Sequence, residues 1–488
     1  MGDLAELEAR VRSDLARLAY PAPGWMPTGK PAAMDMGGDL GGDGGGNRDD
    51  PVLDVAIIGG GQGGLATAFG LLRERITNIA VFDRNRPGEE GPWVTFARML
   101  TLRTPKHVTG PDLGIPSLTP QSWFEARHGR EAWEALGKIS RHDWQDYLAW
   151  YRRVLRLPVE NETELVSLRP EGALLRLELR GPDGAHRGRL ARKLVLATGI
   201  DGGGAWHIPE LISAAVPAGR YAHTSQGIDF GQLRGRRVGV LGAGASAFDN
   251  AATALEAGAA SVALCLRRAE IPRINPYRWM ESAGFLGHFA ELPDLMRWRF
   301  MRHIYDLNQP PPQDTFWRCR RHEGFSFHTG CPWEAVRMED DAIVVRTPKG
   351  TMRFDFVIIG TGFTIDLGLR PELAGLAPHV ALWRDRFTPP PGEESTPLAS
   401  HPYLGDAFQF LERRPGEQPW LGRIHNFTFG ATPSMGLSGA SISGMKFGVS
   451  RLVRGIARDF YREDAGLHLQ SLLSYTAPEL VSLDAPSA

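Results

Sequence analysis

The sequence of 488 residues contains little cysteine, with only Cys265, Cys319 and Cys331. No two of them form a C-x-x-C pair, so the sequence indicates neither a disulfide framework nor a thiol-redox couple. A reducing compartment fits this usage, and we expect a cytoplasmic protein.

Long apolar runs and an excess of one charge are also lacking. No window approaches about 18 uninterrupted apolar residues, and the amino terminus is charged throughout, so neither a membrane span nor a secretion signal is expected. The formal net charge of -1 removes the bulk electrostatic case for nucleic acid or an acidic membrane surface. Small molecules are therefore the expected partners.

With 42% hydrophobic residues, the chain can bury the cores of two or three domains. An amphipathic helix that packs on the body or on another subunit is predicted by apolar residues at helical spacing, namely Leu4, Leu7, Val11, Leu15 and Leu18. We assign residues 1–33 to this helical segment and the glycine- and aspartate-rich residues 34–51 to a linker.

A glycine-rich turn follows the apolar run "LDVAIIG". Gly59, Gly61 and Gly64 occupy the three places of G-x-G-x-x-G, which permit a tight turn, approach of a pyrophosphate and close helix packing. A second apolar run ends at Asp83, 24 positions after Gly59, where a carboxylate accepts the ribose hydroxyls of an adenine nucleotide. The pattern predicts an FAD or NAD site. The alternative is a strand-to-helix turn without a ligand.

The same design recurs 183 positions later without the acidic residue. Gly242, Gly244 and Ala247 take the three glycine places, and the next predicted strand ends in Arg267 and Arg268. Guanidinium groups match phosphate geometry, so this pattern favours the 2′-phosphate of NADPH. Otherwise these arginines are solvated charges at a strand end.

Two further apolar runs end in small residues, at Ala197 to Gly199 and at Gly360 to Phe363. They bracket the second repeat and allow the chain to pass close to a cofactor. We therefore expect an α/β fold with two Rossmann-like domains, the NADPH domain being inserted into a discontinuous FAD domain. The predicted boundaries are 52–200 and 355–460 for the FAD domain, 201–354 for the NADPH domain with a helical insertion, and 461–488 for a tail.

These motifs resemble those of the two-dinucleotide-binding-domain flavoproteins, and more narrowly the class B flavin monooxygenases. This superfamily includes flavin-containing, N-hydroxylating and Baeyer-Villiger monooxygenases. The matching pieces include "GPW" at Gly91 to Trp93, "ATG", "GTGF" and Ser246 in the second glycine motif. The family fingerprint F-x-G-x-x-x-H is present as "PAGRYAH", with Pro217 in place of the aromatic residue while Gly219 and His223 are kept.

The resemblance implies a reaction in which NADPH reduces FAD and the reduced flavin forms a peroxyflavin with dioxygen. One oxygen atom then enters a small molecule, and the protein supplies position, charge and exclusion of water. The cofactor-binding residues expected from the motifs and the resemblance are Gly59, Gly61, Gly63, Gly64, Asp83, Arg84, Trp93, Lys106, Val166, Thr198, Gly199, Gly242, Gly244, Ser246, Ala247, Arg267, Arg268, Thr361, Gly362, Phe363 and Met435. The histidines lack metal-ligand spacing, so no metal site is expected.

Arg103 and His223 are the expected catalytic residues. By the resemblance, Arg103 takes the place of a polar residue beside the peroxyflavin, where it would stabilise negative charge or hold a carboxylate substrate. A surface position or a cofactor-phosphate contact is the alternative for Arg103, and the same ambiguity holds for Lys106 and His107.

Two later segments are candidates for the substrate and flavin sites. Residues 271–330 mix aromatic residues and arginines on predicted helices, which fits either a pocket between the domains or ordinary helix packing. Met435 to Ser441 precede a late helix whose amino end, in similar flavoproteins, faces the isoalloxazine ring.

The predicted function is oxygenation of nitrogen or sulfur in a small molecule. Baeyer-Villiger oxidation of a ketone is an alternative from the same superfamily. An NADPH-dependent reductase of a quinone or disulfide is another, although the missing C-x-x-C pair disfavours a disulfide. A nucleotide sensor and a homo-oligomer also remain open.

Overall fold

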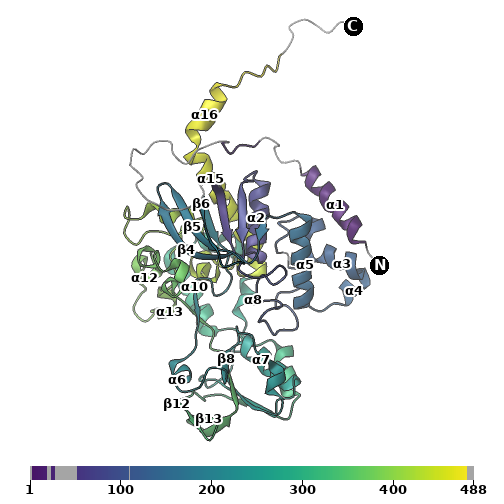
Figure 1. The fold of residues 1–488 in the computed structure, drawn as a ribbon, viewed down its shortest axis with the longest axis vertical. Coiled ribbons are helices and arrows are strands. Elements are labelled where there is room, and N and C mark those ends of the chain that lie inside the picture. Colours follow the sequence, from purple (N-terminus) through teal and green to yellow (C-terminus); the bar gives the residue numbers. More distant parts are fainter. Residues whose placement is uncertain (1–2, 19–23, 28–51, 109, 481–488) are drawn as a thin grey trace.

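The computed structural model describes residues 3–18, 24–27, 52–108 and 110–480. The expected linker 34–51, part of the segment 1–33 and the end of the tail lie outside these residues. Two units follow one another along the long axis of the molecule, the larger built on the first glycine-rich repeat and the smaller on the second (Figure 1).

The larger unit is organised around a sheet of seven strands in the order β3-β2-β1-β6-β5-β4, with β17 beside β6. The pairs β3-β2, β2-β1, β1-β6 and β6-β17 are parallel, while β4 and β5 extend the sheet as antiparallel strands. The strands are β1 (Leu53–Ile58), β2 (Ile79–Phe82), β3 (Val159–Glu160), β4 (Glu164–Glu171), β5 (Leu174–Arg180), β6 (His186–Leu196) and β17 (Ile424–Asn426).

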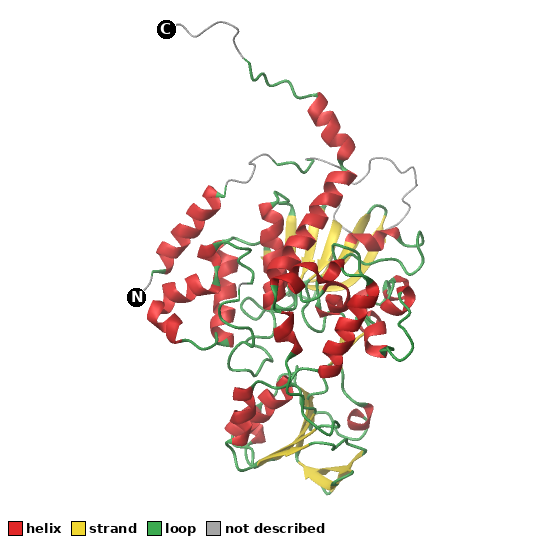
Figure 2. Cartoon of the chain, turned by 180° about the vertical axis from the view of Figure 1, so that it is seen from behind, coloured by secondary structure: helices red, strands yellow, loops and turns green. Residues whose placement is uncertain are grey.

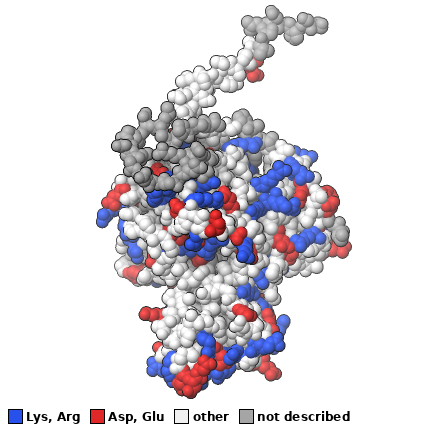
Figure 3. All heavy atoms as spheres, in the orientation of Figure 1, with Lys and Arg blue, Asp and Glu red and all other residues white. Residues whose placement is uncertain are grey.

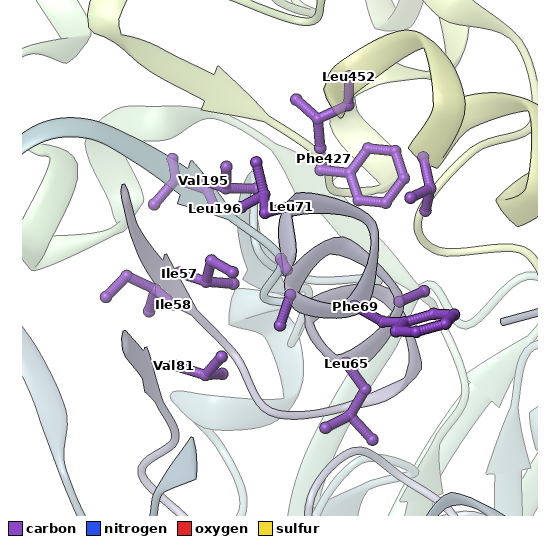
Figure 4. Close-up of a cluster of buried hydrophobic side chains, with 14 of the residues drawn as sticks. Ile57, Ile58, Leu65, Phe69, Leu71, Val81, Val195, Leu196, Phe427 and Leu452 are labelled. Atoms are coloured by element: carbon purple, nitrogen blue, oxygen red, sulfur yellow. The ribbon is translucent and has the colours of Figure 1, made fainter. Parts of the chain in front are cut away.

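The main core lies between this sheet and two helices, α2 (Gln62–Arg73) and α15 (Ile442–Glu463). β1 reads as a continuous apolar run because helices and strands bury it on both faces. Figure 4 shows Ile57 of β1, Val195 of β6 and Leu71 of α2 in one cluster with Phe427 and Leu452. This cluster holds the turn between β1 and α2 in place.

Further helices surround the larger unit. α1 (Leu4–Arg17) packs through Leu7 and Val11 on the main core, near a group of three helices. These three are α3 (Pro120–His128), α4 (Arg130–Ala135) and α5 (Arg141–Val154). The last helix, α16 (Ala465–Leu473), projects beyond the body in Figures 1 and 2.

The smaller unit contains a parallel sheet in the order β11-β10-β9-β15-β8. Its strands are β8 (Tyr221–His223), β9 (Arg237–Leu241), β10 (Ser261–Cys265), β11 (Phe325–His328) and β15 (Phe356–Ile359). The helices are α6 (Glu210–Ser213), α7 (Ala245–Glu256) and α11 (Gln313–Arg320). An antiparallel meander completes the unit, with β12 (Ala335–Glu339), β13 (Ala342–Thr347) and β14 (Gly350–Phe354).

The position of β15 corrects one expected boundary. Residues 355–460 were expected to resume the FAD domain, but β15 pairs with β9 and β8 of the second sheet. The apolar run before Gly360 is needed there because β9 would otherwise lack a neighbour on that side. The chain returns to the larger unit through β16 (Phe363–Ile365), which pairs antiparallel with β7 (Gly204–Trp206).

The helical insertion of the second domain packs on the larger unit. It comprises α8 (Pro276–Met280), α9 (Ala283–His288) and α10 (Asp294–Leu307). Its apolar residues form a separate core with α12 (Trp383–Arg386), α13 (Thr396–Ala399) and Leu437, which follows α14 (Thr432–Met435). The predicted insertion thus shares a core with residues of the larger unit and lies between the two units (Figure 1).

The surface carries both signs of charge. On the face drawn in Figure 3, acidic and basic side chains are interspersed over both units. Among the described residues, no helix is both long and apolar enough to cross a membrane.

Candidate functional site

The first glycine-rich turn leaves open space above the start of α2. Gly59 has a φ of 105°, and an ideal Cβ on it would lie 2.5 Å from the carbonyl oxygen of Ala197. Gly61 is the N-cap of α2, and a Cβ there would meet nothing nearer than Gly91 at 3.9 Å. The first turn of α2 contains no acidic residue, so its free amide groups and positive dipole end suit a phosphate.

Asp83 stands at the end of β2, next to this turn. Its Oδ2 accepts a hydrogen bond of 2.7 Å from the Gly60 amide, and its Oδ1 accepts one of 2.8 Å from Asn85. Burial raises the pKa of the Asp83 carboxyl, and the two amide bonds oppose this shift. The carboxylate is therefore fixed beside the glycine turn, as an adenosine ribose site requires.

A pocket of about 330 Å³ opens beside the same turn. Its lining includes Gly60, Gly61, Leu65, Glu90, Gln145 and Arg152. Arg84 is exposed just beyond Asp83 and lines a second hollow. Val166 lies where the register between β4 and β5 shifts, at the edge of this region. The cradle and its pocket fit the adenine half of FAD.

The second turn has the same geometry at the start of α7. Gly242 has a φ of 111°, and a Cβ on it would lie 2.2 Å from the Gly360 carbonyl oxygen. Gly244 is the N-cap of α7, with no atom within 4 Å of an ideal Cβ, and Ser246 is exposed in the first turn. Ala247, in the third glycine place, is fully buried. This cradle also fits a dinucleotide phosphate.

The two arginines after β10 have different surroundings. Both are exposed, and Arg268 donates a hydrogen bond of 3.1 Å to the carbonyl oxygen of Asp306. Arg267 has no acidic partner within 4.0 Å among the residues that the structure describes. Arg267 is therefore the freer of the two to bind a 2′-phosphate.

The residues expected near the flavin ring come from several elements. Trp93 is buried and its ring meets that of Trp144 edge-on at 6.2 Å. The run Ala197 to Gly199 leaves β6 beside the first turn, where Gly59 approaches it. These residues line one side of the path from the glycine turn toward the smaller unit.

The run after β15 lies at the connection between the units. Thr361 donates its hydroxyl to the carbonyl oxygen of His207, and the Gly362 carbonyl accepts a bond of 3.0 Å from the His207 amide. The Phe363 ring lies 5.9 Å from that of Trp206 and 5.1 Å from that of Phe429. These residues therefore join the two units as well as bordering the site.

The amino end of α15 meets that of α2. α15 begins at Ile442 after the N-cap Ser441, and an ideal Cβ on Gly63 would lie 3.1 Å from the Gly439 carbonyl oxygen. Met435 is buried at the end of α14, just before this loop. The two helix ends thus direct amide groups to neighbouring parts of one site.

The guanidinium group of Arg103 is partly occupied by an ion pair. Its Nη2 lies 3.1 Å from Oδ2 of Asp249, a buried carboxylate on α7. Asp249 also accepts a bond of 3.1 Å from the Thr315 hydroxyl and lies 3.6 Å from Arg318. Burial raises the pKa of the Asp249 carboxyl, with both arginines opposing the shift. Arg103 thus forms an ion pair between the units, and its catalytic role stays a prediction.

Lys106 is occupied elsewhere. Its Nζ donates to the carbonyl oxygens of Trp133 and Glu134 at the end of α4, at 2.5 and 3.3 Å, and lies 5.0 Å from the Trp133 ring centroid. His107 is exposed. Lys106 thus holds its loop against the end of α4. A contact between Lys106 and a cofactor would require these hydrogen bonds to break.

His223 is buried at the end of β8. Its Nδ1 lies 2.8 Å from the Ser225 hydroxyl, and its ring packs at 5.1 Å from Trp206. Burial lowers the pKa of His223 to about 4, although a backbone hydrogen bond to Gly362 opposes the shift. The imidazole is therefore neutral at pH 7, and its expected catalytic role stays a prediction.

Sequence reasoning missed Asp249, Arg278 and Arg318. Asp249 follows Phe248 in an alanine-rich helix. The one signal in the sequence is a carboxylate on a helix face that is otherwise apolar. No group of three or more His, Cys, Asp and Glu residues suited to a metal occurs in the part of the chain that is described.

Family models match two parts of the chain. A model described as FAD-NAD(P)-binding matches residues 56–201, and one described as L-lysine 6-monooxygenase/L-ornithine 5-monooxygenase matches residues 134–290. Among solved structures, ornithine hydroxylase (PvdA) from Pseudomonas aeruginosa has a TM-score of 0.65 at 18% identity, covering 84% of this chain and 99% of the other. At this identity the likeness shows the fold, two dinucleotide-binding domains in one chain.

A reductase shares this fold. Bacillithiol disulfide reductase from Bacillus cereus has a TM-score of 0.54 at 17% identity, covering 84% of this chain and all of the other. The fold alone therefore does not distinguish an oxygenase from a disulfide reductase. Similarity in sequence is needed to tell these two activities apart.

One relative covers nearly the whole chain. The FAD-dependent urate hydroxylase of Xanthomonas campestris is 46% identical over 482 residues, which are 98% of this chain and 97% of that protein. This coverage includes both glycine-rich turns, the insertion and the α15 region. The chain therefore belongs to the FAD-dependent urate hydroxylase family of class B flavin monooxygenases, and FAD and a nicotinamide dinucleotide are its cofactors.

Proposed function

We propose that this enzyme hydroxylates urate with dioxygen and NADPH. One oxygen atom of dioxygen enters urate, the other leaves as water, and NADPH supplies the two electrons. The observation that carries the proposal is the 46% identity to a urate hydroxylase over almost all of both chains.

Each of the chain's own groups has a task in this reaction. The amides at the start of α2 hold the FAD pyrophosphate, and Asp83 accepts from the ribose. The start of α7 holds the NADPH pyrophosphate, and Arg267 holds its 2′-phosphate. Bound FAD would supply the electron transfer and the activation of dioxygen.

Disulfide reduction fits less well. Cys265, Cys319 and Cys331 are all buried, and burial raises the pKa of Cys265 and Cys319 to about 12. Thiol-disulfide exchange needs an accessible thiolate, which these two thiols do not provide at neutral pH.

N-hydroxylation of an amine is the second candidate. The lysine/ornithine monooxygenase model matches residues 134–290, which include the second turn and part of the insertion. Urate and amino acids differ in charge and shape, so one enzyme site is not expected to favour both.

The test is oxygen and NADPH consumption by the FAD-loaded enzyme with urate, L-ornithine or L-lysine. Urate should accelerate NADPH oxidation and gain one labelled oxygen atom from 18O2. The matched control Gly244→Val should keep FAD and lose the NADPH-dependent rate. Acceleration by ornithine or lysine alone would favour the second candidate, and NADPH oxidation that yields only hydrogen peroxide with all three would count against both.

A further inference from the structure

The insertion brings Arg278 against the loop that carries Arg103. α8 is held by the side chain of Asn275, which accepts from the Tyr277 amide, and by the fully buried Met280. From this helix, Nη2 of Arg278 reaches within 3.5 Å of the carbonyl oxygen of Arg103. The Arg278 side chain thus contacts the backbone of the loop that carries Arg103, 175 positions away in the sequence.

Arg103 uses only part of its hydrogen-bonding capacity. Nη2 is paired with Asp249, while the Nε atom is shielded from solvent and has no hydrogen-bond partner among the described residues. The side chain is 31% exposed, so one part of the guanidinium still faces open space. A buried donor without an acceptor is costly unless a ligand supplies one.

The charges around these arginines do not balance. Glu256 pairs with Arg318 at 2.8 Å and Asp249 pairs with Arg103 at 3.1 Å. Arg278 is exposed and, within the described ranges, has no carboxylate within 4.0 Å. One positive charge is therefore left over at the junction of α8, α7 and the Arg103 loop.

An exposed aromatic side chain follows Arg278 on α8. Trp279 is 60% exposed, and its ring stacks on Phe300 of α10 at 5.7 Å with an interplanar angle of 25°. This contact fixes the indole while leaving much of it open to a second planar group. The exposed face of α8 therefore carries a positive charge without a carboxylate partner and, at the next residue, an exposed indole.

We infer that Arg278 is a specificity residue that binds the anionic edge of urate. This inference rests on the proposed function. Urate is a planar purine that carries one negative charge at neutral pH, and its adjacent nitrogen and oxygen atoms match the parallel N–H groups of a guanidinium. The NADPH pyrophosphate is the competing anion, and the experiment separates the two.

The experiment measures KM for urate and NADPH, and the Kd of urate by calorimetry, for the FAD-loaded enzyme and its variants. Arg278→Ala should raise the KM and Kd of urate about 10- to 100-fold, since a hydrogen-bonded charge is lost. The KM of NADPH should stay within about twofold. Arg278→Lys keeps the positive charge but loses the planar pair of N–H donors, so its KM and Kd for urate should lie between those of the wild type and Arg278→Ala.

Two controls separate charge recognition from general damage. Arg12→Ala removes an exposed arginine on α1 and should leave the KM of urate, the KM of NADPH and the Kd of urate unchanged. Hypoxanthine, a purine that is uncharged at neutral pH, should bind the wild-type enzyme more weakly than urate. In Arg278→Ala, the ratio of the Kd of hypoxanthine to the Kd of urate should be smaller than in the wild type.

The outcomes distinguish the inference from the proposed function. If the wild-type enzyme neither binds nor oxidises urate, the proposed function is wrong. If it does both and Arg278→Ala leaves the urate constants unchanged, or raises only the KM of NADPH, the role of Arg278 is wrong while the function stands.

Discussion

The turn after β1 and the turn after β9 differ in where the helix that follows is most tightly packed. In the first turn, Gly64 faces the Gly59 carbonyl oxygen, which an added Cβ would approach to 1.8 Å, and the neighbouring strand ends in Ala197. In the second, the helix carries Ala247 and the neighbouring strand ends in Gly360, whose added Cβ would lie 2.6 Å from that of Ala247. The first helix thus packs most tightly on its own turn, and the second on the residue that follows the neighbouring strand.

The strands next to the two turns also end in different charges. β2 ends in the buried acid Asp83, while β10 is followed by the exposed Arg267 and Arg268. We therefore expect steric requirements to keep the two backbones alike, and the charge at the strand end to set which nucleotide each turn prefers. The following substitutions test this comparison.

The largest effect is expected for Gly64→Ala. The new methyl group meets backbone rather than a movable side chain, so we expect a loss of about 3 kcal/mol or more in the free energy of unfolding. The reverse change in the second turn, Ala247→Gly, should cost only about 1 kcal/mol, as for glycine in a helix. Thermal unfolding of both variants measures this, and equal losses would refute the difference between the turns.

Valine at the second glycine of each turn should affect binding instead of folding. Gly61 and Gly244 have φ angles of -73° and -69° and free space around an ideal Cβ. Gly61→Val should yield a folded protein with little bound FAD, read from flavin absorbance per protein. Gly244→Val should keep its flavin and raise the KM of NADPH about 10-fold or more. Normal flavin content in Gly61→Val would remove FAD from the first turn.

A smaller effect is expected for the arginines after β10. Arg267→Ala should reduce the preference for NADPH over NADH about 10-fold, since it removes one charge-assisted contact. Arg268→Ala should have less effect, because Arg268 already donates to the Asp306 carbonyl. The ratio of kcat/KM for the two coenzymes measures both, and a larger effect of Arg268 would reverse this assignment.

The smallest effect concerns pH and the buried histidine of the second sheet. The pKa of His223 is about 4 in the folded protein and about 6.5 when unfolded, so the unfolded chain binds more protons between these values. Its contribution to stability is complete above pH 6.5 and is lost as the pH falls toward 4. Lowering the pH from 7 to 6 should cost about 0.7 kcal/mol.

His223→Gln should remove this part of the pH dependence. The matched variant in the first sheet is His425→Gln, because burial also lowers the pKa of His425 to about 4. Unfolding midpoints at pH 7 and 6 measure both variants. An unchanged pH slope in His223→Gln would show that the histidine does not titrate in this range.

The sequence predicted the glycine turns, Asp83 and the two-domain plan because each depends on neighbouring residues. It misplaced β15, since an apolar run does not reveal which sheet it joins. The pairing of Arg103 with Asp249 joins residues 146 positions apart, and no local pattern encodes such a contact. The packing of α8 to α10 on the larger unit depends likewise on distant partners, among them Trp383 and Leu437.

The pairing of β7 with β16 has a mechanical consequence. Two-stranded ribbons resist stretching through their hydrogen bonds but twist readily. Rotation about this ribbon would carry the Arg103–Asp249 pair apart while leaving each nucleotide cradle intact. The ion pair of Lys138 with Asp314 at 3.2 Å and the contact of Arg98 with the Phe230 ring also cross between the units, so such a rotation would have to break them as well.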